Sequence, residues 1–243
     1  MAEAEWRRVA GFQVVKSWPQ SRFAPPVTAR IPAIARLAGL AGVLLLLAGC
    51  IAVVVAFGVQ RHAPQPSRSA AGEVGPRARG PWLRRSAPVS VEIPAIGVDS
   101  ALLHLGKNAN GTIAVPSLNA RVSRAAWYKY SPTPGQIGAS VIEGHVDSYQ
   151  GPAIFFRLGA LHPGDRVIVR LADGITANFR VTGVRQYLKS KFPSKAIFGP
   201  THYAALHLIT CGGAFDYETH HYLSSTVVFA SLTSYRRPGH RRH

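Results

Sequence analysis

Two side chains in this sequence have the types and neighbours expected of an acyl-transfer site. Cys211 follows the apolar run Leu206–Thr210 and precedes Gly212 and Gly213. A thiolate is a strong nucleophile, and glycines permit close approach of another chain and unusual backbone dihedrals. His145 also follows a glycine at the end of an apolar run, in "SVIEGHVDS". Imidazole is the usual group that activates a thiol and moves its proton.

The alternative reading of Cys211 is an inert, buried thiol, and its position alone does not separate the two. Cys211 and His145 taken together favour a nucleophilic thiol. Two strand ends that each carry one reactive side chain beside glycine can meet on one rim of a barrel. Metal binding is the competing use of Cys and His. The chain has no Cys-x-x-Cys or His-Glu-x-x-His, and the adjacent His220 and His221 cannot both face one site on a strand. We therefore expect no metal and no cofactor.

An uncharged stretch of 23 residues, Leu37–Val59, predicts a retained transmembrane helix. At about 1.5 Å per residue it spans a hydrocarbon core of roughly 30 Å. The second cysteine, Cys50, lies inside this stretch in "LAGC". That motif leaves open a lipidated Cys50 or a cleaved signal, but nine more apolar residues follow it and the preceding segment is long for a signal peptide. Six Lys/Arg on each side leave the orientation undecided by charge.

Composition divides the remaining chain into segments. We expect a disordered cytoplasmic segment at 1–36, a Pro/Arg-rich linker at 60–88, a catalytic domain at 89–234 and a basic tail at 235–243. The domain contains 12 Lys/Arg against 8 Asp/Glu, whereas the whole chain carries a net charge of +17. The excess charge therefore lies in the tails, which argues against nucleic-acid binding and fits an anionic membrane or wall polymer.

Alternating apolar residues and turn signals predict an all-β domain. The expected strands lie in "VSVEIPAIGVDSALLHL", "GTIAVP", "GASVIEGHVD", "ALHLITC" and "STVVFASLT", with a hairpin around Asp173-Gly174 in "DRVIVRLADGITANFRVTGVRQYL". Seven or eight strands with only short helices, such as one in "GPAIFFRLGAL", indicate a closed β-barrel.

The order and spacing of these motifs resemble the sortase family. The stretches "PTPGQIGASVIEGHVDSYQGPAIFFRLGALHPGDRVIV", "YLKSKFP", "LHLITCGGAFDYETHHY" and "VVFA" look like an actinobacterial sortase, closest to class F, over roughly Val91–Ala230. The resemblance implies an eight-stranded barrel anchored in the cell membrane by one helix, with the catalytic domain extracytoplasmic.

The resemblance also implies a reaction and its partners. Cys211 would attack the threonine carbonyl of a Leu-Pro-x-Thr-Gly-like signal at the C-terminus of a substrate protein and form a thioacyl intermediate. His145 would be the acid for the leaving amine and then the base for the acceptor. The acceptor would be an amine, such as a cell-wall precursor or a pilin lysine.

One departure concerns the oxyanion. Sortases carry an Arg about a dozen residues after the cysteine, whereas this window reads Tyr222, Leu223, Ser224, Ser225, and no Arg occurs from Cys211 to Tyr235. We consider several substitutes: an Arg from another strand, the imidazoles of the histidine pair, or a neutral hydrogen bond from one of the serines. The candidate oxyanion or substrate contacts are Thr210, Gly212, His220, His221, Ser224 and Ser225. On an alternating strand Glu143 and His145 share a face, where Glu143 would raise the pKa of His145 or serve as a rim charge.

Two rivals to an active sortase follow from the sequence. An L,D-transpeptidase is also a β-rich Cys/His acyltransferase, but its usual Ser-His-Gly-Cys run is absent, since Cys211 follows Ile209-Thr210. A degenerate barrel that binds sorting signals or wall peptides without turnover is supported by the missing Arg alone.

Overall fold

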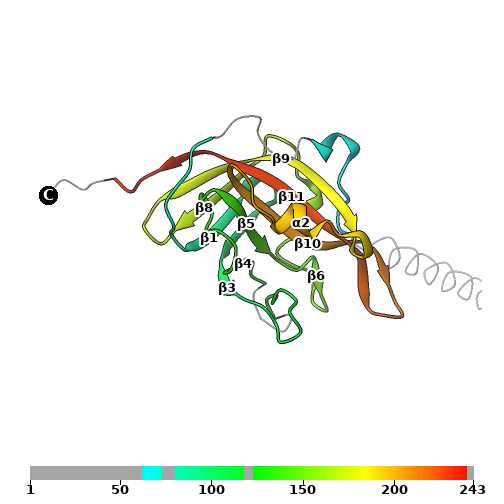
Figure 1. Cartoon of the computed structure of the whole chain (residues 1–243). Helices are drawn as coiled ribbons and strands as arrows, with labels where there is room; N and C mark the ends of the chain where they lie inside the picture. Colours follow the sequence, from blue (N-terminus) through cyan, green and yellow to red (C-terminus); the bar gives the residue numbers. More distant parts are fainter. Residues whose placement is uncertain (1–61, 73–79, 118–122, 240–243) are drawn as a thin grey trace, which may run out of the picture. The chain divides into compact units, whose positions relative to one another are not determined.

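The computed structural model describes residues 62–72, 80–117 and 123–239 (Figure 1). The main sheet contains nine strands in the order β2-β1-β8-β9-β11-β10-β5-β4-β3. Their bounds are β1 Pro88–Ile93, β2 Val98–Ala101, β3 Leu103–Leu105, β4 Ala126–Tyr128, β5 Gly138–Glu143, β8 Arg166–Leu171, β9 Thr176–Leu188, β10 Ala204–Asp216 and β11 His221–Arg236. A separate two-stranded ribbon pairs β6 (Asp147–Ser148) with β7 (Gly151–Pro152).

The two edge strands of this sheet are consecutive in the chain, so the sheet curls into a nearly closed barrel. Only Leu102 separates β2, which pairs with β1, from β3, which pairs with β4. When β2 and β3 are counted as one bent strand, the barrel has the eight strands that the sequence predicts. Closure leaves no long unpaired edge on the sheet.

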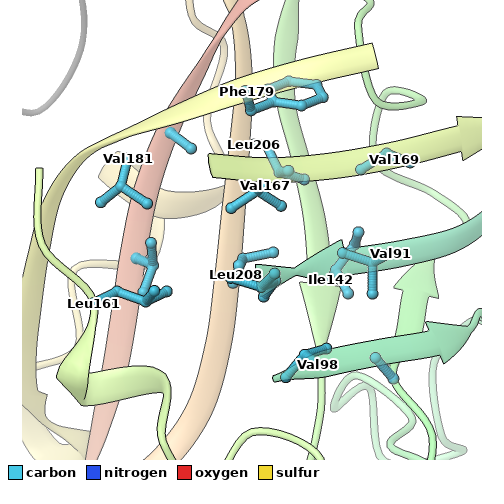
Figure 2. Close-up of a cluster of buried hydrophobic side chains, with 14 of the residues drawn as sticks. Val91, Val98, Ile142, Leu161, Val167, Val169, Phe179, Val181, Leu206 and Leu208 are labelled. Atoms are coloured by element: carbon cyan, nitrogen blue, oxygen red, sulfur yellow. The ribbon is translucent and has the colours of Figure 1, made fainter. Parts of the chain in front are cut away.

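The barrel interior is filled by the inward-facing residues of the strands. β8 buries alternate residues, and its pairing with β9 follows the predicted turn, where Gly174 has a φ of +81°. Figure 2 shows side chains from several strands pointing into one common core, among them Val91, Ile142, Val167, Val169, Phe179, Leu206 and Leu208. This core fixes β5 and β10 side by side.

A second, smaller apolar cluster lies on the other side of β10. It contains Val141, Ile197, Ile209, Val227 and Phe229, and half-buried Tyr128, Tyr187 and Phe192 pack against it. The short helix α2 (Ser194–Phe198) carries Ile197, and Phe192 directly follows the 3-10 turn η4 (Lys189–Lys191). Buried His207 of β10 donates a hydrogen bond from Nδ1 to the carbonyl oxygen of Ile197 at 2.7 Å, which ties α2 to the strand.

The described residues upstream of β1 include a segment that packs on the barrel, and we call residues 62–72 the N-terminal strap. Its short helix η1 (Arg68–Ala71) is capped by Ser67, whose hydroxyl accepts from the amide of Ala70 at 3.2 Å. Ala70 is 0% exposed and belongs to the main core. The composition of 60–88 predicted a linker, and residues 62–72 of it make these contacts.

Other local expectations differ from the structure. "GTIAVP", predicted as a strand, contributes only an isolated bridge between Lys107 and Ile113. β4 was not predicted, because three residues are too few for a visible alternation. The short helix predicted in "GPAIFFRLGAL" is the 3-10 turn η3 (Leu158–Ala160), and β7 occupies the start of the same stretch. A further 3-10 turn, η2 (Pro94–Ile96), links β1 to β2.

None of the helices in the described residues has the length and apolar character needed to cross a bilayer. The predicted transmembrane stretch 37–59, the segment 1–36 and the tip of the basic tail at 240–243 lie outside the described residues.

Candidate active site

His145 and Cys211 lie at the same end of two neighbouring parallel strands. β5 and β10 pair in parallel, and the last register partners are Glu143 and Ile209. The amide of Gly144 still donates to the carbonyl oxygen of Ile209 at 3.1 Å. His145 follows Glu143 by two positions and Cys211 follows Ile209 by two positions, on strands about 4.8 Å apart. The register therefore brings the two residues to one end of the barrel.

Cys211 is a free, half-buried thiol in a row of side chains that crosses three strands. It lies opposite Ser225 of β11, and Ser225 lies opposite Tyr187 of β9. Directly paired residues place their side chains on the same face of a sheet. Ser225 and Tyr187 are half-buried on this face, next to the smaller apolar cluster. Tyr187 carries no sequence signal for this position, because only the register of β9 places it there.

The His145 ring is oriented by a backbone carbonyl. Its Nε2 lies 2.6 Å from the carbonyl oxygen of Pro116. A carbonyl only accepts hydrogen bonds, so Nε2 carries the hydrogen and Nδ1 is the nitrogen left to exchange a proton. The backbone of His145 is held as well, since its carbonyl accepts from the amide of Phe155 at 3.0 Å. Gly144 is required here, because an added Cβ would lie 2.7 Å from Phe155.

A hydrogen bond that the sequence does not reveal joins the histidine segment to the cysteine hairpin. The hydroxyl of Tyr222 donates to Oδ2 of Asp147, and the two residues are 75 positions apart. Burial raises the pKa of Tyr222, the bond to Asp147 and the negative charge of Asp147 raise it further, and the charge of Cys211 adds to the shift. The phenol therefore stays protonated and remains a donor.

Several predicted contacts lie on the face of β10 and β11 opposite Cys211. Thr210 and Ser224 are each 5% exposed. The Thr210 hydroxyl has no hydrogen-bond partner among the described residues. Gly212 pairs with Ser224, and a Cβ on Gly212 would lie 2.7 Å from Oγ1 of Thr226. Of the two serines, only Ser225 lies beside the thiol.

The predicted imidazoles lie at the far end of the β10–β11 hairpin. His220 and His221 are exposed, His220 has a φ of +53°, and His221 pairs with Asp216. His221 is four residues from Ser225, which is about 13 Å along a strand. Figure 1 shows this hairpin (orange) extending away from the barrel. The structure therefore does not bring the two histidines to Cys211.

Within the described part of β11, one position on the thiol face could carry a cation beside Cys211. On β11 the neighbours of Ser225 on the thiol face are Val227 and Leu223, because side chains alternate along a strand. Leu223 is 47% exposed and apolar. Arg185 of β9 lies on the same face, opposite Val227. Its Nε and Nη2 donate to the carbonyl oxygens of Ala71 and Gly72 at 3.2 and 3.0 Å, so its guanidinium is bound to the strap.

Glu143 lies on the thiol face one row before Cys211. It pairs with Ile209 on one side and with Ala126 on the other. Burial raises the pKa of this carboxyl from 4.5 to about 7. The shared face expected for Glu143 and His145 does not follow from strand alternation, since β5 ends at Glu143 and His145 lies in the following loop.

The described residues contain no group of three or more His, Cys, Asp or Glu side chains arranged to hold a metal ion. What the site holds is a thiol, an oriented imidazole and hydroxyl donors at one end of a barrel. Such a set can perform nucleophilic acyl transfer with acid–base help from the imidazole.

Comparisons with solved structures give low sequence identity. Sortase A from Corynebacterium diphtheriae is 19% identical, with 62% of each chain covered and a TM-score of 0.45. Sortase A of Listeria monocytogenes is 14% identical, with 65% of this chain and 93% of that chain covered and a TM-score of 0.46. The sortase of Actinomyces oris is 19% identical, with 69% and 90% covered and a TM-score of 0.45. The match thus spans about three fifths of the C. diphtheriae chain.

No curated protein matches the chain. The sequence does match the sortase domain family over residues 91–233, which is more than half of its length and includes both His145 and Cys211. The fold, a mostly β, nearly closed barrel with few short helices, is the barrel expected of this family. The chain belongs to the sortase family.

Proposed function

We propose that this protein is a membrane-anchored cysteine transpeptidase, similar to class F sortases, that cleaves a Leu-Pro-x-Thr-Gly-like signal between Thr and Gly. The observation that carries the proposal is the parallel register of β5 and β10, which brings His145 and Cys211 to one end of adjacent strands. The family match adds the expected reaction class, a transpeptidation by a cysteine nucleophile.

In the first half-reaction the Cys211 thiolate attacks the threonine carbonyl carbon. The tetrahedral intermediate collapses, the C–N bond to glycine breaks, and the glycine amine leaves with a proton from His145. In the second half-reaction His145 takes a proton from the acceptor amine, which attacks the thioester and releases the thiolate. Because Nε2 donates to Pro116, we assign this proton exchange to Nδ1.

Ser225 is the side chain we assign to the oxyanion. Its position opposite Cys211 is the closest approach that the register offers to a hydroxyl on β11. A neutral hydroxyl stabilises a developing negative charge less than a guanidinium does, because hydrogen bonds from charged donors are roughly twice as strong. We therefore expect a slower enzyme than a sortase with Arg on this strand.

The partners and location follow from the same assignment. The substrate would be a protein with a C-terminal sorting signal, and the acceptor an amine such as a cell-wall precursor or a pilin lysine. Residues 37–59 would anchor the chain in the cell membrane as a single helix, with the barrel on the extracytoplasmic side.

The second candidate function is a barrel that binds sorting signals or wall peptides without turnover. The exposed Leu223 favours it, since the thiol face of β11 offers no cation near Cys211 within the described residues.

An acylation experiment separates the two candidates. The full-length chain in detergent is incubated with a Leu-Pro-x-Thr-Gly peptide, with and without an amine, and analysed by intact mass. A Cys211 acyl adduct that disappears in Cys211→Ala and nearly disappears in His145→Ala supports the enzyme. Peptide binding without an adduct supports the binding module. Full adduct formation by His145→Ala would contradict the acid–base role.

A further inference from the structure

The loop that carries His145 is linked to the hairpin that carries Cys211 at a point beyond both residues. After His145 and buried Val146, the chain enters the β6–β7 ribbon at Asp147. Asp147 Oδ2 accepts the hydrogen bond from the hydroxyl of Tyr222, the second residue of β11. Both side chains are half-buried.

Tyr222 is fixed on its other side by ring packing. Its ring centroid lies 5.0 Å from that of Phe215, at an angle of 70°, and the two residues are register partners across the hairpin. Edge-to-face packing of this kind is favourable and restricts the ring. The hydroxyl is therefore presented to Asp147 by a ring that cannot turn away without losing the Phe215 contact.

Within the described residues, the other hydrogen bonds that hold His145 and Gly144 reach no residue of the β10–β11 hairpin beyond Ile209. The ring of His145 bonds to Pro116, its carbonyl to Phe155, and Gly144 to Ile209. Cys211 lies two residues past Ile209, where β5 has already ended. The relation between the imidazole and the sulfur thus depends on a link farther along the hairpin, and Asp147–Tyr222 is such a link.

We propose that Asp147 and Tyr222 are a positioning pair that holds His145 in register with Cys211 for proton transfer. The inference rests on the proposed function, because it assigns the pair a role in that same site. Neither residue exchanges a proton with substrate. Small misplacements of a catalytic group cost rate steeply, up to about 10²-fold for 1 Å.

The test compares kcat and KM for peptide cleavage by full-length variants. Tyr222→Phe keeps the ring on Phe215 and removes only the hydroxyl. We expect it to lower kcat about tenfold with little change in KM, because positioning acts on the chemical step. Asp147→Ala should cause a similar loss, and the double variant should be no slower than either single variant. Asp147→Asn, which still accepts the bond, should retain most of the wild-type kcat.

Tyr217→Phe is the matched control, because exposed Tyr217 contacts the same Phe215 ring at 5.1 Å. It should behave as the wild type. A wild-type kcat for Tyr222→Phe, strictly additive losses in the double variant, or an equal loss in Tyr217→Phe would each overturn the proposal.

Alkylation of Cys211 by iodoacetamide separates this proposal from the proposed function, since it needs no sorting signal. A nearby imidazolium favours the thiolate, so we expect Tyr222→Phe to alkylate severalfold more slowly than the wild type. If the wild type forms no peptide adduct but this difference is seen, the proposed function fails and the positioning pair stands. Equal alkylation rates would overturn the pair.

Discussion

Ser225 of β11 lies directly opposite Cys211 of β10, whereas Ser224 pairs with Gly212 and is buried on the other face. Because side chains alternate along β11, substitution of Ser225 and substitution of Ser224 should affect the acylation rate differently. Ser225→Ala should lower the acylation rate by about 10²-fold if its hydroxyl serves the oxyanion, since removal of one such donor has an effect of that order. Single-turnover acylation of Cys211 measures it.

Ser224→Ala is the control for this prediction, because its hydroxyl packs against Gly213 and does not face the thiol. We expect at most a modest loss of stability and a nearly unchanged acylation rate. If Ser224→Ala slowed acylation as much as Ser225→Ala, the assignment of Ser225 would be wrong.

Leu223 is the position from which a cation on β11 would serve Cys211. It is on the face of Ser225 and exposed, so a long side chain there is accommodated without loss of core packing. Leu223→Arg should raise kcat/KM for peptide cleavage at least about tenfold, because a guanidinium is a stronger oxyanion donor than a hydroxyl. Leu223→Met, long but neutral, should leave kcat/KM near the wild-type value. A decrease in kcat/KM for Leu223→Arg would show that the negative charge of the oxyanion does not develop next to β11.

The sequence predicts the parts of the molecule that rest on local patterns. Alternating apolar residues locate β8, β9, β10 and β11, and the dipeptide Asp173-Gly174 locates the turn between the first two. The sequence also places a glycine beside Cys211 and beside His145, and in the structure Gly144 and Gly212 each lie where an added Cβ would contact a neighbouring side chain.

The remaining features depend on contacts between residues far apart in the chain. Asp147 and Tyr222 are 75 positions apart, and neither has a distinctive local pattern. The strap has the Pro, Ser and Arg content of a disordered segment. Its contacts with the barrel include buried Ala70 and the carbonyls of Ala71 and Gly72 that accept from Arg185, and composition does not predict them. The short strand β4 owes its existence to its pairing with β3 and β5.

Glu143 should make stability depend on pH. Burial raises the folded-state pKa of Glu143 to about 7, so the folded state holds the proton more tightly than the unfolded chain, whose value is 4.5. This contribution to the free energy of unfolding is complete below pH 4.5 and is lost as the pH rises through 7. The loss is at most about 3 kcal/mol, and solvent around the half-buried carboxyl reduces it.

Denaturant unfolding of wild type and Glu143→Gln between pH 4.5 and pH 8 measures this effect. The variant should gain stability relative to the wild type as the pH rises, because Gln remains neutral. Glu218→Gln, at an exposed position in the β10–β11 turn, should show no such trend. A constant difference between Glu143→Gln and wild type across this range would contradict the raised pKa.

The strap should support both the barrel and the site. Ala70 is 0% exposed within the core, whereas the next residue, Ala71, is exposed. A carboxylate at position 70 would be buried without a partner, so Ala70→Asp should detach the strap or lower the free energy of unfolding by at least about 2 kcal/mol. Ala71→Asp places the same group in solvent and should leave the free energy of unfolding nearly unchanged. Denaturant unfolding and limited proteolysis of the strap compare the two.

Detachment of the strap should also slow acylation. Gln65 of the strap accepts a hydrogen bond from Gln186, whose Nε2 is 3.3 Å from the position that a Cβ on Gly212 would take. Gln186 thus packs against the backbone that follows Cys211, and the strap holds Gln186 in place. Gln65→Ala should therefore lower the acylation rate severalfold without the large stability loss of Ala70→Asp. If both variants acylated at the wild-type rate although proteolysis showed the strap released, the strap would support the fold and have no part in the site.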